Sequence, residues 1–205
     1  MKKITQYRDT GREALSTRAK LLLAGKEEFF QKGYQAASLR RICAACGVTT
    51  GAFYFLFSCK DALFCEIADP FINRWKALSD RLAFKEMNDL STGPSNDREL
   101  MTFLLGFREE LLILMEKSAG SSREAFSSLI FETLTGFFTE TFFQNSGQKP
   151  DSEAIKLLVY IRIQGIMYIL KGDYTMEQAL FLNDTLARHS DAGFRKLIEN
   201  SKTMF

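Results

Sequence analysis

The spacing of apolar residues predicts a chain that is helical almost throughout. Apolar side chains recur every three or four residues, as on one face of an α-helix, and no stretch shows the alternation expected of a β-strand. Turn-forming segments divide this pattern into helices at about residues 17–32, 58–87, 97–117, 121–144, 152–171 and 175–201, with two short helices between about residues 38 and 57. Asp69-Pro70 predicts a kink or a helix boundary. The predicted fold class is all-α.

Several of these helices begin with residues that can cap them. Capping boxes, in which two side chains each bond an unpaired amide, are predicted at Ser121/Glu124 and Thr175/Gln178, with an approximate one at Ser58/Asp61.

The stretch opened by Ser38 reads as two short helices joined by a tight turn. Ser38 and Thr49 can cap the two helices, because a hydroxyl oxygen accepts a hydrogen bond from an amide in the first turn. Gly47 lies where the first helix must end, and we expect a positive φ there, which costs glycine little. Phe53 and Phe57 lie four residues apart and should face the domain interior. Helices joined in this way form a helix-turn-helix, whose second helix enters the DNA major groove.

The residues around this turn carry a longer pattern. From Gly47 to Phe57 they read Gly-Val-Thr-Thr-Gly-Ala-Phe-Tyr-Phe-Leu-Phe, followed by Lys60-Asp61-Ala62-Leu63. Upstream, the pattern includes Thr17, Arg18, Leu21, Ala24, Phe29, Gly33 and Tyr34. At these spacings the chain resembles the TetR (tetracycline-repressor) family of transcriptional regulators over about residues 15–67. The resemblance implies an N-terminal arm and helix-turn-helix DNA-binding domain over residues 1–66, and a helical effector-binding and dimerisation domain over residues 67–205.

By this resemblance, the residues that contact DNA are Ser38, Arg40, Thr49, Thr50, Gly51, Tyr54, Phe55 and Lys60. Thr49 and Tyr54 would donate hydroxyls to phosphate, and Lys60 would add a positive charge. Thr50 and Phe55 would face the bases. Gly51 would allow the helix to approach the DNA closely. Ser38 and Arg40, at the start of the preceding helix, would contact the opposite wall of the groove.

The chain departs from the family pattern at three positions. Thr50 stands where lysine is common, Leu56 where histidine is common, and Arg41 where an acidic residue is usual. The helix that enters the groove is therefore almost uncharged, and Arg40 and Arg41 can offset this from the preceding helix. We infer no operator sequence from such a helix.

Charge is distributed unevenly although the formal net charge is only +2. Residues 1–66 carry 11 Lys and Arg against 6 Asp and Glu, whereas the remainder carries 16 against 19. A basic N-terminal domain fits nucleic-acid binding, and chance asymmetry fits the counts as well. Residues 1–15 form a polar, basic arm with two open interpretations: contact with DNA, or a terminus without function.

Cys43 and Cys46 have the Cys-x-x-Cys spacing of some redox and metal sites. Both fall where the family has small buried residues, no second cysteine pair stands at zinc-finger spacing, and the single histidine, His189, is remote in sequence. We interpret them as core thiols, with a redox or metal sensor as the alternative. The residues offer no catalytic constellation, so we predict no enzyme, no cofactor and no metal site.

The C-terminal part is rich in phenylalanine, with most of the chain's 19 in residues 64–143. Rigid rings can leave apolar space for a flat or greasy small molecule, and the family binds effectors in this region. The candidate pocket residues are Phe71, Trp75, Phe103, Phe107, Phe131 and Phe138. A phenylalanine-rich core explains the same residues.

The segment at about residues 152–171 is apolar on nearly all sides and must therefore be covered on all sides. One face can pack on its own domain and the other on a second copy of the chain, together with the helix at about residues 175–201. A fully buried helix in a monomer is the alternative. We see neither a signal peptide nor an apolar run long enough to cross a bilayer, so we expect a cytoplasmic protein without a membrane partner.

Together these features predict a homodimeric transcriptional regulator that binds a near-palindromic double-stranded DNA operator. We expect a repressor that is released by a small hydrophobic or aromatic effector. The alternative from another class is a helical DNA-organising or protein-interaction module that uses the same DNA-binding domain without an effector. A footprint confined to one palindrome favours the regulator, and dispersed binding favours the module.

Overall fold

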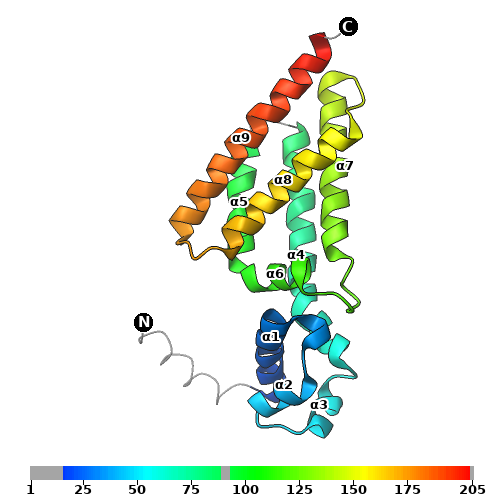
Figure 1. Ribbon diagram of the computed structural model, residues 1–205, viewed down its shortest axis with the longest axis vertical. Helices are drawn as coiled ribbons and strands as arrows, with labels where there is room; N and C mark the ends of the chain where they lie inside the picture. The colour runs from blue at the N-terminus through cyan, green and yellow to red at the C-terminus, as the bar shows by residue number, and fades with distance from the viewer. Residues whose placement is uncertain (1–15, 89–92, 204–205) are drawn as a thin grey trace. The chain divides into compact units, whose positions relative to one another are not determined.

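Figure 1 shows a computed structural model of the chain, which describes residues 16–88 and 93–203. These residues form α-helices and contain no strand, which confirms the all-α prediction. The helices are α1 (Thr17–Ala36), α2 (Leu39–Ala45), α3 (Thr50–Leu56), α4 (Lys60–Asn88), α5 (Gly93–Gly106), α6 (Arg108–Glu116), α7 (Phe126–Ser146), α8 (Ser152–Lys171) and α9 (Met176–Thr203). Within the described ranges, no helix is both long enough and apolar enough to cross a membrane. The basic arm predicted at residues 1–15 lies outside the described residues.

The local predictions about the helix-turn-helix are confirmed. The Ser38 hydroxyl oxygen accepts from the Arg41 amide at 3.4 Å at the start of α2, and the Thr49 hydroxyl oxygen accepts from the Ala52 amide at 3.1 Å at the start of α3. Gly47 follows α2 with a φ of +68°. Each cap satisfies an amide that the helix itself leaves unpaired. The turn and both helix starts therefore follow from local side-chain chemistry.

The first helix also stops where predicted. Gly33 has a φ of +74° within the span of α1, so regular helical geometry ends there. Glycine tolerates a positive φ because it has no Cβ atom. The amide of the next residue, Tyr34, donates to the Lys117 carbonyl at 2.8 Å instead of continuing the helix.

The middle of the chain differs from the prediction. Of the two possibilities at Pro70, the helix boundary does not form, since α4 runs from Lys60 to Asn88. Ala68 and Phe71 are buried on either side of the proline, and this packing offsets the hydrogen bond that the proline removes. The single helix predicted over residues 97–117 is wrong, because α5 and α6 are separate. At the break, Phe107 donates its amide to Leu104 at 3.2 Å in a tighter turn.

The capping box predicted at Ser121/Glu124 is wrong. Helix α7 starts later, and Ala125 precedes it without a side-chain cap. The Ser121 hydroxyl donates to the Ser118 carbonyl at 2.6 Å, and the Glu124 carboxylate accepts from the Gly120 amide at 2.8 Å. Both polar side chains therefore stabilise the preceding turn, which competes with the cap for the same groups.

The other two capping boxes have opposite outcomes. At α4, the Asp61 carboxylate accepts from the Ser122 amide at 3.0 Å, a partner 61 residues away, so the approximate box predicted with Ser58 is wrong. At α9, the box is confirmed. Thr175 donates its amide to the Gln178 side chain at 3.0 Å, and Gln178 donates its amide to the Thr175 hydroxyl oxygen at 3.2 Å.

The chain divides into two compact units. The first comprises the described residues up to Ile72 together with Ile113–Glu124, and the second comprises Asn73–Leu112 and the residues from Ala125 onward. Residues of α4 and α6 fall in both units. Nothing in the hydrophobic pattern indicated that Ile113–Glu124, hereafter the 113–124 segment, folds with the N-terminal helices.

Within the second unit, α8 and α9 pack with α5 and α7. The buried side of α8 carries apolar residues at helical spacing: Ile155, Val159, Ile163, Met167 and Leu170. An ion pair lies among them, between Arg162 of α8 and Asp97 of α5, whose side chains are only 13% and 14% exposed. Removing either partner would leave a buried charge unpaired, so this pair specifies how α5 meets α8.

Candidate nucleic-acid interface

An aromatic core supports the helix-turn-helix. Phe29, Phe53 and Phe64 are fully buried, and the rings of Phe29 and Phe64 meet edge to face with centroids 5.1 Å apart. Phe53 of α3 also stacks on Phe57, which directly follows the helix, at 5.4 Å, so both residues expected to face inward do so. Burying one such side chain contributes about 1.5–3 kcal/mol. The outer face of α3 is therefore presented on a rigid support.

Arg18 ties the end of α3 to two other helices. Its guanidinium donates to the Leu56 carbonyl at 3.2 Å and lies 4.6 Å from the centre of the Phe57 ring. The same group pairs with Glu66 of α4, with 2.8 Å between Nε and Oε1. One side chain thus fixes α3 between α1 and α4, a role that the resemblance at Arg18 did not reveal.

The outward face of α3 carries the residues expected to meet DNA. Thr49, Thr50, Gly51, Tyr54 and Phe55 are all exposed. Tyr54 is 57% exposed and Phe55 is 92% exposed. Because the Thr49 oxygen accepts from the Ala52 amide, its hydroxyl proton remains available to a phosphate oxygen. The structure therefore brings together the five α3-side residues that the sequence singled out.

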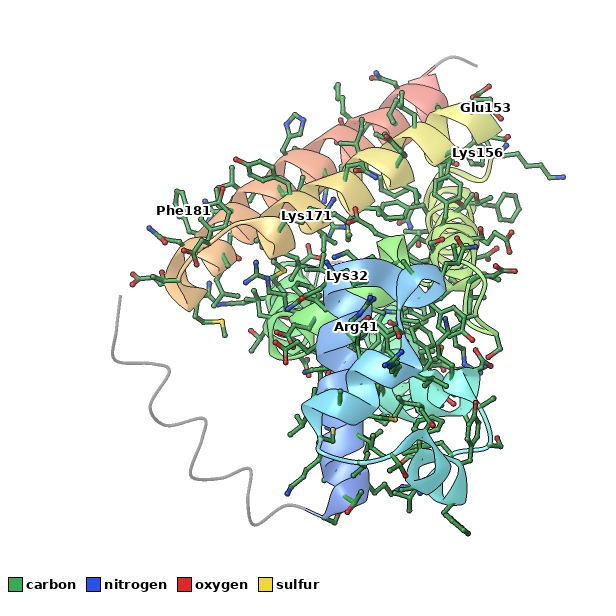
Figure 2. All side chains as sticks on the ribbon, turned by 60° about the horizontal axis from the view of Figure 1, so that its bottom comes forward. Lys32, Arg41, Glu153, Lys156, Lys171 and Phe181 are labelled. Atoms are coloured by element: carbon green, nitrogen blue, oxygen red, sulfur yellow. The ribbon has the colours of Figure 1, made fainter. Side chains whose placement is uncertain are left out.

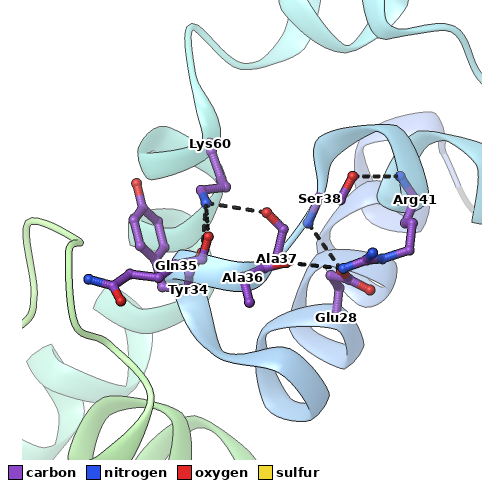
Figure 3. A network of polar contacts seen from close by, with 8 residues as sticks. All are labelled: Glu28, Tyr34, Gln35, Ala36, Ala37, Ser38, Arg41 and Lys60. Atoms are coloured by element: carbon purple, nitrogen blue, oxygen red, sulfur yellow. Dashed lines mark hydrogen bonds and ion pairs between the residues drawn. The ribbon is translucent and has the colours of Figure 1, made fainter.

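Lys60 lies beside this face but points into the protein (Figure 3). Its ammonium donates to the carbonyls of Tyr34 at 2.6 Å, Ala37 at 3.3 Å and Gln35 at 3.4 Å. It also lies 4.4 Å from the centre of the Tyr34 ring. These carbonyls lie in the last residues of α1 and just after it, beyond the break at Gly33, and they give the ammonium three acceptors. In the DNA-free chain, Lys60 is therefore a structural tie between α1 and α4.

The two arginines of α2 have different surroundings. The Arg41 guanidinium donates to Glu28 from Nε at 2.8 Å and to the Ala36 carbonyl at 3.0 Å (Figure 3). Glu28 also accepts from the Ser38 amide at 3.0 Å. Burial raises the pKa of Glu28, but the hydrogen bonds from Arg41 and Ser38 outweigh it and hold that pKa below its usual value. Both arginines are exposed, but Arg41 is held by Glu28 and the Ala36 carbonyl, so Arg40 is the α2 arginine better placed to reach a phosphate.

The 113–124 segment is bound to the first unit at several points. The Lys117 ammonium donates to the Phe30 carbonyl and lies 4.5 Å from the centre of that ring. Arg123 donates from Nε to the Asp69 carboxylate at 2.7 Å and from Nη2 at 2.9 Å. Sequence reasoning missed these residues. The sequence placed Lys117 at the end of one predicted helix and Arg123 in the first turn of the next, and neither position indicated a partner among the N-terminal helices.

Asp61 organises a second set of contacts with this segment. Burial raises its pKa, but hydrogen bonds from Ser122 and from Tyr34 lower it below the usual value. Burial and the neighbouring Asp61 carboxylate raise the pKa of Tyr34 to about 12. The Cys65 sulfur lies 3.1 Å from the Ser122 hydroxyl. At neutral pH, Asp61 is therefore an ionised acceptor and Tyr34 a neutral donor.

The cysteines lie in the first unit without forming disulfides. Cys43 is buried, Cys46 and Cys65 are partly buried, and Cys59 is exposed. Burial raises the pKa of the Cys43 thiol, which disfavours the thiolate needed for redox or metal chemistry. In the described ranges, no three His, Cys, Asp or Glu side chains gather closely enough to hold a metal.

The predicted pocket residues are spread over both units. Phe71 is buried in the first unit, whereas Trp75, Phe103, Phe107, Phe131 and Phe138 belong to the second. Within the second unit they enter different ring contacts. Trp75 meets Phe126 at 5.6 Å, Phe103 meets Phe107 at 5.0 Å, and Phe138 meets Phe194 at 5.1 Å. These contacts fit a phenylalanine-rich core.

Comparison with protein families gives an independent match to this region. Residues 21–67 match the profile described as "Bacterial regulatory proteins, tetR family". YdgC of Bacillus subtilis (strain 168), an uncharacterized HTH-type transcriptional regulator, is 30% identical over 89 residues. That alignment covers 43% of this chain and 45% of the relative, so the chain spans less than half the length of this curated protein.

Two solved structures are similar across most of the chain. NalD of Pseudomonas aeruginosa, the secondary repressor of the MexAB-OprM multidrug efflux pump, is 26% identical with a TM-score of 0.52, covering 88% of this chain and 95% of NalD. AibR, crystallised with isovaleryl coenzyme A and operator DNA, is 19% identical with a TM-score of 0.54, covering 84% and 96%. The similarity to AibR concerns the fold alone.

Proposed function

We propose that the chain is a TetR-family transcriptional regulator, a repressor that binds a near-palindromic operator as a homodimer. The observation that carries the proposal is the exposed outer face of α3, mounted on buried Phe53 and Phe57. A rigid helix with an accessible face is what insertion into the major groove requires. The family consists of regulators rather than enzymes.

The proposed DNA contacts are Ser38, Arg40, Thr49, Thr50, Gly51, Tyr54, Phe55 and Lys60. Hydroxyls of Thr49 and Tyr54 donate to phosphate, and exposed Arg40 adds a charge from α2. Thr50 and Phe55 face the bases. Lys60 either reaches phosphate after leaving its carbonyl partners or acts by holding α4 against α1, and replacing it by methionine distinguishes these roles.

Dimerisation is proposed through α8 and α9. Large apolar side chains remain exposed on these helices: Leu157, Tyr160, Ile161, Tyr168, Phe181 and Leu197. Figure 2 places Phe181 and Lys171 at the end where α8 and α9 meet, and Glu153 and Lys156 at the other end of α8. Such a face suits burial against a second copy. A two-fold dimer then presents two α3 helices about 34 Å apart, one duplex turn, and requires a near-palindromic site.

An effector is proposed for the second unit. The rings of Trp75, Phe103, Phe107, Phe131 and Phe138 supply the apolar surface that a small hydrophobic or aromatic molecule needs, whereas Phe71 belongs to the first unit. The complex of AibR with isovaleryl coenzyme A supports an acyl-bearing ligand as one class to test. The effector must bind the DNA-free form more tightly to release the operator. We place this activity in the cytoplasm.

The test is selection of short duplexes from a randomised library with the full-length protein. A repressor enriches one near-palindrome and binds it with two chains per duplex. The matched variants are Tyr54→Phe, which removes one phosphate donor, and Lys76→Ala, an exposed charge on α4 outside the proposed DNA and dimer surfaces that should leave affinity unchanged. Binding without sequence preference would contradict the proposal and favour a DNA-organising module.

A further inference from the structure

The recognition helix α3 has no side chain that can read a base pair through paired hydrogen bonds. Its residues from Thr50 to Leu56 are Thr, Gly, Ala, Phe, Tyr, Phe and Leu. Discrimination in the major groove usually comes from arginine or lysine on guanine and from asparagine or glutamine on adenine. A lone hydroxyl can bond several bases and separates them poorly. Base preference through α3 must therefore come from apolar contact.

Phe55 is the apolar side chain placed to make that contact. At 92% exposure it is the most exposed large apolar side chain of the described chain, while Phe53 of the same helix and Phe57, which follows the helix, are buried. The side chain therefore contributes little to the core. At Gly51, one turn earlier, a Cβ atom would meet only the Thr49 hydroxyl oxygen within 4 Å, at 3.7 Å. The helix face beside Phe55 therefore carries little side-chain bulk, and the ring projects beyond it.

Only one apolar group lies on a base edge in the major groove of unmodified DNA. This is the C5-methyl group of thymine, which packs against alanine, threonine methyl or phenylalanine. Building on the operator binding proposed above, we propose that Phe55 reads the C5-methyl group of a thymine in each operator half-site and thereby sets the base preference of α3. The group recognised is a methyl on a pyrimidine C5, so 5-methylcytosine presents it and uracil lacks it.

The size of the effect follows from the area of one methyl group. Burying one methyl-sized group changes affinity by about fourfold, so one half-site should lose about fourfold when its thymine is replaced by uracil. The two half-sites are remote from each other, so replacing both should cost about 15-fold.

The experiment uses the full-length protein and the duplex enriched from the randomised library. Each thymine is replaced by deoxyuridine, first in one half-site and then symmetrically, and affinity is measured by fluorescence anisotropy. We expect one thymine per half-site to show the fourfold and 15-fold losses. Phe55→Ala should bind the thymine and uracil duplexes equally. Its fold should be intact because the side chain is exposed.

Tyr54→Phe is the matched control on the same helix. It keeps the ring and removes the hydroxyl, so it should weaken both duplexes equally and preserve their ratio. A cytosine placed at the sensitive position should gain affinity when it is methylated at C5, and this gain should disappear in Phe55→Ala.

Three results would overturn the proposal. Equal binding of every thymine and uracil pair would exclude methyl reading while leaving operator binding intact. A ratio that survives in Phe55→Ala would assign the methyl contact to another residue. Loss of affinity in Phe55→Ala with no dependence on the methyl group would indicate a ring wedged between base steps. A library without any enriched duplex would instead remove the operator-binding function itself.

Discussion

Replacing Lys60 by methionine separates two roles that predict different measurements. The resemblance assigns the ammonium to a DNA phosphate, whereas the structure places it 2.6 Å from the Tyr34 carbonyl and 3.3 Å from the Ala37 carbonyl. Methionine keeps an unbranched apolar stem and removes only the charge and the donors. We expect Lys60→Met to destabilise the protein and to leave the number of phosphate contacts unchanged.

The magnitude can be worked from the contacts. A hydrogen bond from a charged donor contributes about 1.5–3 kcal/mol, and a cation–π contact at a partly exposed site about 0.5–1 kcal/mol. Lys60 is partly buried and the carbonyls left behind can bond water, so the loss should be about 2 kcal/mol. In a chain of this size each kcal/mol lowers Tm by about 2–4 °C, which gives an expected fall of about 4–8 °C.

Two assays decide between the roles. Calorimetry gives Tm, and operator affinity measured across a salt series gives the slope of log K against log salt, to which each phosphate contact contributes about 0.9. Arg40→Met is the control, because Arg40 is exposed and should lower the slope by about 0.9 per chain without lowering Tm. A Lys60→Met variant with unchanged Tm and a slope reduced by the same amount would refute the reasoning.

Three further changes test the rest of the structure. Tyr160→Glu places a charge on the exposed face of α8 and should convert the dimer to a monomer with unchanged helicity, as measured by analytical ultracentrifugation and circular dichroism; a dimer of unchanged affinity would rule out that face. Asp69→Asn leaves Arg123 without its half-exposed partner and should lower the free energy of urea unfolding by about 0.5–1 kcal/mol. Glu28→Gln removes a carboxylate that has a lowered pKa. Burial raises the pKa of Glu28, but hydrogen bonds, chiefly from Arg41, outweigh burial and lower it overall. Its stabilising effect is present above the ordinary pKa of about 4.3 and disappears as pH falls through the lower folded value, so the difference in stability between wild type and variant should shrink steadily as pH falls below about 4.3.

Features encoded within a few residues were predictable. The caps at Ser38, Thr49 and Thr175 each join a side chain to an amide three residues away, so sequence spacing contains both partners. The bounds of α8 match the predicted ones, and the structure adds a cap of the same kind, since Asp151 accepts from the Ala154 amide at 2.8 Å. The exposed face of α3 followed from periodicity once Phe53 was assigned to the core.

The failed capping predictions involve polar side chains that bond another partner, either nearby or far along the chain. Asp61 was expected to cap α4, yet the Ser122 amide reaches it from far along the chain. Ser121 was expected to open α7, yet the preceding Ser118 carbonyl takes its hydroxyl. A polar side chain that fits a local cap also fits any other amide or carbonyl that folding brings near. Spacing alone cannot rank these two outcomes.

Main-chain carbonyls explain why the basic residues were hardest to assign. Lys60 bonds the end of α1, Lys117 bonds the Phe30 carbonyl, and Arg108 donates to the carbonyls of Leu170, Lys171 at 3.2 Å and Gly172 at 3.1 Å at the end of α8. Every residue carries such a carbonyl, so the acceptor leaves no mark in the sequence. A basic residue in a DNA-binding chain therefore resembles a phosphate contact until the fold shows a helix end beside it. Arg40 of α2 is then the exposed cation that remains to contact phosphate beside the uncharged helix α3. The outward side chain of Phe55 therefore gives the sharper test of how the chain recognises DNA.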